Sequence, residues 1–101
     1  MHPKYLRMLE RIKDDGGTEW SVYVLRCVDG SLYTGITKNI EARVDAHNSG
    51  RGGAYTRTHR PVTLLYREEG FSRAAALRRE AAIKRFPRPR KESLCKIQSK
   101  K

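Results

Sequence analysis

The chain has 101 residues and a formal net charge of +11 at neutral pH, which is enough for one domain with a modest core but too little for two. No apolar stretch approaches membrane-spanning length and no secretory leader is recognisable, so we expect a cytoplasmic protein without a membrane partner. The charge is uneven: residues 1–50 hold seven Lys/Arg and seven Asp/Glu, whereas residues 51–101 hold fifteen and four.

An asymmetry this large favours a polyanionic partner, and nucleic acid is the obvious one. A solvated, lysine-rich surface is the alternative for a smaller excess, and charge alone does not distinguish DNA from RNA. No protein partner can be inferred. Cys27 and Cys95 are two isolated cysteines without metal-ligand spacing and do not suggest a disulfide framework or a zinc site, so we expect small core residues in a reducing compartment.

Residues 3–14 show apolar positions at helical spacing, which predicts an amphipathic helix ending at the Asp-Asp-Gly-Gly run. We interpret it as an accessory element without a chemical role. Residues 1–19 are therefore treated as an accessory helix and linker.

Two β-branched and aromatic runs, 22–25 and 32–36, flank the turn signal Asp29-Gly30. This pattern predicts a β-hairpin. Tyr23 stands on its first strand and Tyr33 on its second. Either tyrosine alone could be an ordinary strand aromatic.

The length of the hairpin loop decides whether Tyr23 and Tyr33 share a face. A two-residue loop pairs Arg26 with Tyr33 and puts the tyrosines on opposite faces. A three-residue loop with Gly30 in a left-handed conformation pairs Leu25 with Tyr33 and puts both on one face. The residues alone leave both registers open.

Residues 39–48 predict a short helix capped by the asparagine at its start. Ile40 and Val44 mark its buried stripe, and Arg43 and His47 lie beside that stripe, one turn apart. We therefore expect both polar side chains to point toward the sheet. An arginine there needs an anion or a hydrogen-bond partner, whereas the histidine could also be a satisfied residue at the edge of the core.

The segment 50–60 is basic and glycine-rich and contains one aromatic residue. Arg51, Arg57 and Arg60 can meet phosphates, and Tyr55 can stack on a base or donate to a phosphate. A surface loop that is basic only because this half of the chain is basic would have the same composition.

Residues 62–69 predict a third strand closing at Gly70, and residues 72–86 predict a helix. Glu80 falls inside the apolar arc of that helix, where a carboxylate needs a strong partner. Lys84, one turn on, could form an ion pair with it. A divalent cation is the other candidate.

A final helix beginning near Pro89 would bury Leu94 and Ile97 and expose its basic residues, which would form the outer rim of a nucleic-acid surface. A frayed tail after Lys96 is the alternative. Residues 97–101 are treated as a basic C-terminal tail.

The tripeptides Ser21-Val22-Tyr23 and Tyr33-Thr34-Gly35 resemble the two halves of the GIY-YIG nuclease signature. The first half keeps only the tyrosine, and the second departs only in its middle residue. The order of the following elements is also similar: a helix with Arg and His, a basic loop with Tyr, a strand, and a helix with Glu. The resemblance covers about residues 20–95 and is closest to small stand-alone bacterial members.

The resemblance implies an α/β domain of the α+β type, with a three-stranded antiparallel sheet flanked by helices, over residues 20–96. It also implies that Tyr23 and Tyr33 share a face, and hence that the hairpin has an odd loop or a bulge. The site would combine catalytic and substrate-binding residues. The catalytic set is Tyr23, Tyr33, Arg43, His47 and Glu80, and the substrate-binding set is Gly35, Arg51, Tyr55, Arg57 and Lys84.

The activity implied is that of a metal-dependent endonuclease acting on DNA, or alternatively on RNA. By resemblance, Arg43 contacts the scissile phosphate, and Tyr23 is the general base for water, with Tyr33 or His47 orienting it or sharing the proton. Glu80 would bind one divalent cation, Mg or Mn. A tyrosine has a reference pKa near 10, so Tyr23 can serve only if neighbouring cations favour phenolate.

The principal alternative is a binding module that keeps the fold and the basic surface but does not cleave. A weaker one is a structural or ribosome-associated protein that uses its basic half for RNA. The combination of Tyr23, Tyr33, Arg43 and Glu80 favours the enzyme, because binding alone does not require a carboxylate facing a polyanion.

Overall fold

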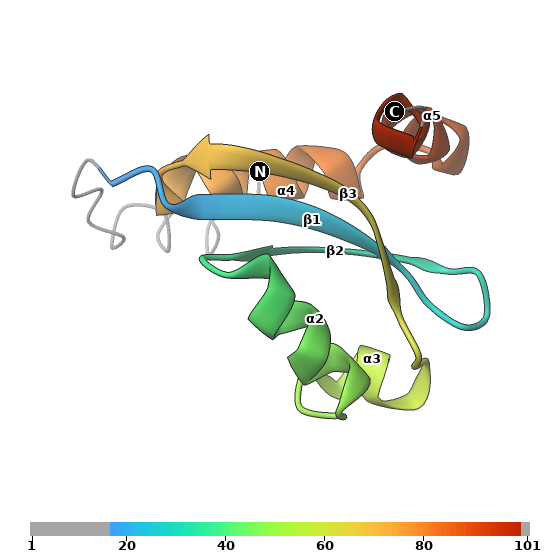
Figure 1. Cartoon of the computed structure of the whole chain (residues 1–101). Coiled ribbons are helices and arrows are strands. Elements are labelled where there is room, and N and C mark those ends of the chain that lie inside the picture. Colours follow the sequence, from blue (N-terminus) through green and yellow to red (C-terminus); the bar gives the residue numbers. More distant parts are fainter. Residues whose placement is uncertain (1–16, 100–101) are drawn as a thin grey trace, which may run out of the picture.

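The computed structural model describes residues 17–99, so the helix expected over residues 3–14 lies outside the described part of the chain. The fold expected from the sequence is confirmed: a three-stranded antiparallel sheet is combined with helices in an α+β arrangement (Figure 1). The elements follow in the order β1 (Trp20–Arg26), β2 (Leu32–Thr37), α2 (Ile40–Asn48), α3 (Ala54–Thr58), β3 (Thr63–Phe71), α4 (Arg73–Lys84) and α5 (Arg88–Ser99).

The hairpin of β1 and β2 has the three-residue loop. Leu25 pairs with Tyr33, and Tyr23 pairs with Gly35. Gly30 has φ +86°, a conformation that an L side chain rarely adopts. Both tyrosines therefore lie on the same face of the sheet.

The third strand differs from the expectation that it closes at Gly70. It runs from Thr63 to Phe71 along the free edge of β1, so β1 is the central strand of the order β2-β1-β3. Gly70 has φ +90°, and the pairing with β1 shifts register between Trp20 and Val22. Because glycine accommodates this bulge without strain, the strand continues through it.

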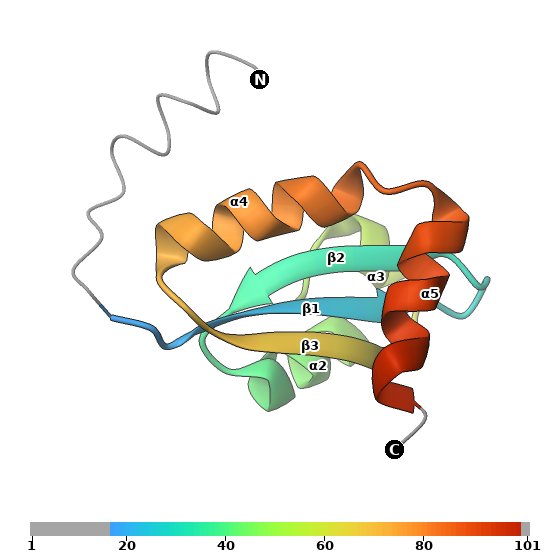
Figure 2. The same ribbon diagram turned by 90° about the horizontal axis from the view of Figure 1, so that it is seen from above.

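The sheet separates two groups of helices (Figures 1 and 2). In Figure 1, α4 and α5 lie above it and α2 and α3 below it. Val22 and Val24 of β1 pack on the first side with residues of α4 and α5. Tyr23 and Leu25 pack on the second side with Ile40 of α2. The alternation of β1 thus builds two thin cores, and the tyrosines belong to the one between the sheet and α2.

Two helix starts agree with the sequence. Asn39 Oδ1 accepts from the Ala42 amide at 3.0 Å, and Ser72 Oγ accepts from the Ala75 amide at 3.2 Å. Helix α4 ends at Lys84, two residues earlier than expected. The segment 50–60, expected as a loop, contains the short helix α3. Among the described helices, none is long and apolar enough to cross a membrane.

Candidate active site

Tyr23 occupies the middle of the central strand and is only 1% exposed. Its partner across the hairpin is Gly35. A Cβ atom at position 35 would lie 2.5 Å from Tyr23 Oη, closer than real Cβ contacts allow. The glycine therefore leaves the space that the phenol ring of Tyr23 fills. This explains why a glycine ends the Tyr-Thr-Gly tripeptide.

Helix α2 brings two polar side chains to the Tyr23 hydroxyl. Arg43 Nε donates to Tyr23 Oη at 3.4 Å, and Arg43 Nη2 donates to the Gly52 carbonyl at 2.9 Å. His47 Nε2 lies 3.0 Å from Tyr23 Oη. The expectation that Arg43 and His47 point toward the sheet is confirmed.

His47 is completely buried and hydrogen-bonded through both ring nitrogens. Its Nδ1 lies 2.6 Å from Oγ1 of Thr56, a fully buried residue of α3. Gly52 passes so close that an added Cβ would lie 2.2 Å from this Nδ1. Neither Thr56 nor Gly52 was singled out from the sequence, because a lone threonine and one glycine among several in a basic segment carry no pattern.

Burial holds both members of the Tyr23–His47 pair in their neutral forms. It raises the pKa of Tyr23; the hydrogen bond from Arg43 opposes this shift, and the charges of Tyr33 and Glu80 add to it. Burial, followed by the charge of Arg43, lowers the pKa of His47 below 6.5. His47 is therefore an uncharged proton acceptor near neutral pH, and Arg43 alone does not favour a Tyr23 phenolate.

Tyr33 lies beside this pair, half-buried. Its ring centroid is 6.5 Å from that of Tyr23 and 5.1 Å from that of His47. Among the described residues, no partner hydrogen-bonds its hydroxyl. That hydroxyl is thus available to a molecule that approaches the site.

The remaining substrate-binding candidates lie farther out. Tyr55 of α3 is stacked near Tyr33, with centroids 6.4 Å apart and an interplanar angle of 17°. Arg51 is exposed and donates to Ser49 Oγ at 2.9 Å, and Arg57 is exposed on α3. Of these three residues, Tyr55 is the one that contacts Tyr33, which lies beside the Tyr23–His47 pair.

Comparison with known sequences decides the family. Residues 19–93 match the sequence model of the GIY-YIG catalytic domain. The chain belongs to the GIY-YIG family. The family is one of nucleases, which implies an interaction with nucleic acid in general terms.

Two bacterial relatives are similar over most of their length. A UPF0213 protein of Staphylococcus haemolyticus is 53% identical over 70 residues, which cover 69% of this chain and 85% of that protein. A UPF0213 protein of Desulfotalea psychrophila is 51% identical over 82 residues, covering 80% of this chain and 74% of the relative. The chain thus resembles UPF0213 proteins of similar extent.

Two structures solved by solution NMR have similar folds. The UPF0213 protein BH0048 of Bacillus halodurans is 38% identical with a TM-score of 0.50, and the match covers 77% of this chain and 83% of that one. The protein EF2693 of E. faecalis is 36% identical with a TM-score of 0.53, and the match covers 89% of this chain and 94% of that one. The fold described above is therefore similar to that of these two solved proteins.

GIY-YIG nucleases generally use a divalent metal, and Glu80 is the residue that the sequence resemblance predicts as its ligand. Its side chain is 17% exposed on α4, and Lys84 Nζ lies 3.6 Å from Oε2. Its charge reaches Tyr23, whose pKa it raises. Residues 17–99 contain no group of three or more His, Cys, Asp or Glu that could hold a metal. A single carboxylate suits a hard cation that keeps water and phosphate ligands.

Proposed function

We propose that this protein is a divalent-metal-dependent endonuclease that hydrolyses phosphodiester bonds, with DNA as the favoured substrate and RNA as the alternative. One observation carries the proposal: a buried tyrosine hydroxyl lies within hydrogen-bond distance of both Arg43 and His47. A phenol placed between a fixed cation and a neutral imidazole can pass a proton. A purely structural tyrosine does not require that combination.

The proton step follows from the hydrogen bonds. Tyr23 Oη accepts from Arg43, which can only donate, so its own proton is directed to His47 Nε2. His47 then donates through Nδ1 to Thr56 Oγ1. When water attacks phosphorus, Tyr23 oxygen takes the water proton while its own passes to His47, which becomes imidazolium. This route does not require a free phenolate and so accommodates the raised pKa of Tyr23.

Arg43 and Tyr33 supply the contacts to the phosphate. The Arg43 guanidinium is positioned by its bond to the Gly52 carbonyl, and its fork geometry suits a phosphate oxygen. In this role it would neutralise charge that develops on the phosphorane oxygens. The Tyr33 hydroxyl, to which no residue in the described range 17–99 hydrogen-bonds, would orient the attacking water or a second phosphate oxygen.

Glu80 would hold the cation. When bound, one Mg or Mn would neutralise phosphate charge and assist the departing oxygen. Lys84, exposed beside Glu80, would release the carboxylate and contact the substrate backbone. Arg51 and Arg57 would meet phosphates farther along the strand. Both cysteines are buried and free, which supports the expectation of a reducing, cytoplasmic setting.

The direct test is cleavage of labelled single-stranded, duplex and branched DNA and of RNA, in Mg or Mn, by the wild type and by Glu80→Gln. We expect the wild type to cut and Glu80→Gln to lose cutting while retaining binding. Glu92→Gln is a matched control, because Glu92 also forms an i to i+4 ion pair, 2.8 Å from Arg88, but on α5. It should cut like the wild type.

A second candidate, the non-cleaving binding module, is favoured by the observation that Lys84 already pairs with Glu80. The same assay separates the two. If the wild type binds but cuts nothing under any condition, the binding module is the better account.

A further inference from the structure

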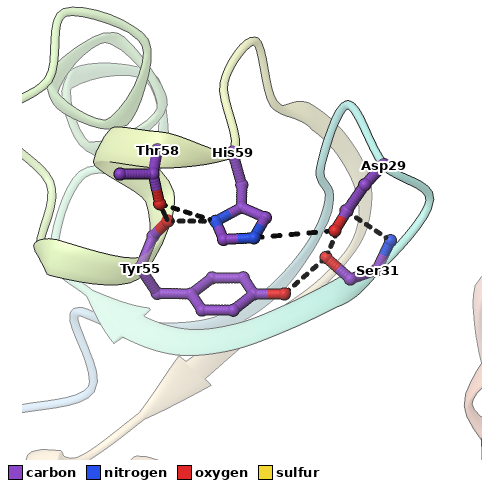
Figure 3. Close-up of polar contacts among 5 residues, drawn as sticks. All are labelled: Asp29, Ser31, Tyr55, Thr58 and His59. Atoms are coloured by element: carbon purple, nitrogen blue, oxygen red, sulfur yellow. Dashed lines mark hydrogen bonds and ion pairs between the residues drawn. The ribbon is translucent and has the colours of Figure 1, made fainter.

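A second aromatic pair lies beyond the proposed catalytic residues, where α3 faces the hairpin loop (Figure 3). The rings of Tyr55 and His59 are parallel, with an interplanar angle of 5° and centroids 4.1 Å apart. Tyr55 belongs to α3, and His59 follows its last residue. We call these two rings the aromatic platform.

Hydrogen bonds fix both rings. The Tyr55 hydroxyl donates to Ser31 Oγ at 2.7 Å, and Ser31 Oγ donates to Asp29 Oδ1 at 2.6 Å. His59 Nδ1 donates to the Tyr55 carbonyl at 2.7 Å, and Asp29 Oδ2 lies 3.6 Å from His59 Nε2. The hairpin loop and α3 thus hold the platform from both sides, as Figure 3 shows.

The platform is fixed but not buried. Tyr55 is 44% exposed, and the His59 side chain is 30% exposed. Core packing therefore does not account for this arrangement. A rigid, exposed ring binds a planar ligand at low entropic cost, because its side chain is already ordered.

The surroundings favour a nucleobase over a phosphate. The Tyr55 hydroxyl is already used by Ser31, and the carboxylate of Asp29 lies at the edge of the platform. A phosphate would be repelled by that carboxylate, whereas an uncharged base would not. Arg57 and Arg60 are exposed in the same segment and can follow the backbone on either side of the base.

The platform is also connected to the catalytic residues. The ring centroids of Tyr55 and Tyr33 are 6.4 Å apart, and those of Tyr33 and His47 are 5.1 Å apart. A nucleotide stacked on Tyr55 would therefore lie next to the one whose phosphate reaches Arg43.

We propose that Tyr55, whose one face is covered by the stacked ring of His59, offers its other face as a stacking site for an unpaired nucleobase beside the scissile phosphate. The preferred substrates are then single strands or junctions with an unpaired base, because bases inside a duplex are stacked on their own neighbours. Stacking tolerates any base, so the selectivity is for structure and not for sequence. This inference rests on the proposed function and specifies its substrate class.

The test measures binding by fluorescence anisotropy without divalent metal, using the full chain. The ligands are a labelled single strand, the same strand with abasic sugars, and a blunt duplex. Tyr55→Leu should weaken binding of the base-bearing strand by about tenfold. Abasic and duplex binding should change by less than about twofold. Tyr55→Phe keeps the ring but loses the hydrogen bond to Ser31 Oγ that helps to order it, so it should lose clearly less binding than Tyr55→Leu.

Two results overturn the stacking site. One is an equal loss for base-bearing and abasic strands in Tyr55→Leu, and the other is a loss in Tyr55→Phe as large as that in Tyr55→Leu. His59→Asn, which keeps a donor for the Tyr55 carbonyl, is a second variant and should weaken only the base-bearing strand. Because the binding assay contains no metal, a negative result contradicts the stacking site but not the nuclease proposal. If stacking is observed and no cleavage is found, only the nuclease proposal is contradicted.

Discussion

Tyr23 Oη and His47 Nε2 lie 3.0 Å apart, although the two residues are separated by 24 positions and come from β1 and α2. Arg43 approaches the same hydroxyl from one turn earlier on the helix. The hydrogen bond between Tyr23 and His47 connects the central strand to α2. The same Tyr23 hydroxyl is the atom that a Cβ at position 35 would meet, so only glycine fits there. Fold and proposed chemistry therefore depend on the same few atoms.

The pH dependence of cleavage should reflect His47. Its pKa is lowered by burial and by Arg43, so the ring becomes protonated only at a lower pH than an ordinary histidine and can accept a proton until then. We expect kcat/KM to fall on the acid side with an apparent pKa below 6.5, measured on one substrate at saturating metal. An acid limb at or above 6.5 would contradict the assignment.

The lowered pKa of His47 also makes the free energy of unfolding depend on pH. The folded-state pKa of His47 is lower than the unfolded one, so its contribution is fully present above the unfolded value and is lost as pH falls through the folded value. An NMR titration of the His47 ring should give a midpoint below 6.5.

Gly35→Ala should disable the site while leaving the sheet formed. The added Cβ would meet Tyr23 Oη at 2.5 Å, and Tyr23 has no free space because it is buried and hydrogen-bonded. We expect a loss of about 1–3 kcal/mol in the free energy of unfolding, as for other overpacked cores. Cleavage should also fall. Urea unfolding and a cleavage assay check both, and wild-type values in both would show that Tyr23 can move.

Thr56→Val should act through His47. The substitution keeps the volume but removes the oxygen that receives the Nδ1 proton at 2.6 Å. Without it the tautomer that leaves Nε2 free to accept is no longer fixed. We expect about a tenfold loss in kcat with an altered acid limb, and Thr56→Ser should restore both. If Thr56→Val only lowers stability, with kcat and the pH profile unchanged, Thr56 is structural.

Glu68→Gln should destabilise the packing of α4 on the sheet. Glu68 accepts from Arg79 Nε and Nη2, each at 2.8 Å, and from the Tyr66 hydroxyl at 2.5 Å. Losing the charged acceptor should cost about 1–3 kcal/mol at pH 7. Arg79 chiefly lowers the pKa of Glu68, so the wild type loses this contribution as pH falls through the folded value. The difference between the two proteins should therefore shrink in acid, as urea melts at several pH values would show.

The sequence was informative wherever a local pattern has one structural solution. The odd hairpin loop could be predicted once both tyrosines were required on one face, because strand alternation leaves no other register. The polar side of α2 could be predicted because Arg43 and His47 flank its apolar stripe. The first prediction needed the resemblance to the GIY-YIG signature, because the residues alone leave both registers open. The second rests on periodicity, which can be read from a single sequence.

What the sequence did not indicate depends on tertiary contacts. Helix α3 lies in a segment whose glycines suggest only a loop, and it is held by contacts of Thr56 and Tyr55 with distant residues. Gly70 suggested a strand end, yet a bulge against β1 lets the strand pass. Tyr55 and His59 are four positions apart, the spacing of neighbours on a helix, but a loop was expected here, so their pairing was not predicted. The hydrogen bond that orders Tyr55 comes from Ser31, 24 positions away in sequence.

The most direct measurement compares the cleavage rates of Tyr23→Phe and Tyr66→Phe with the wild type on its preferred substrate. Both tyrosines are buried on adjacent strands with bonded hydroxyls, but only Tyr23 contacts Arg43 and His47. We expect Tyr23→Phe to lose about 10²-fold or more in kcat with binding retained, whereas Tyr66→Phe should cut normally. If Tyr23→Phe cuts as fast as Tyr66→Phe, Tyr23 is not the proton-transfer residue and the proposed site is wrong.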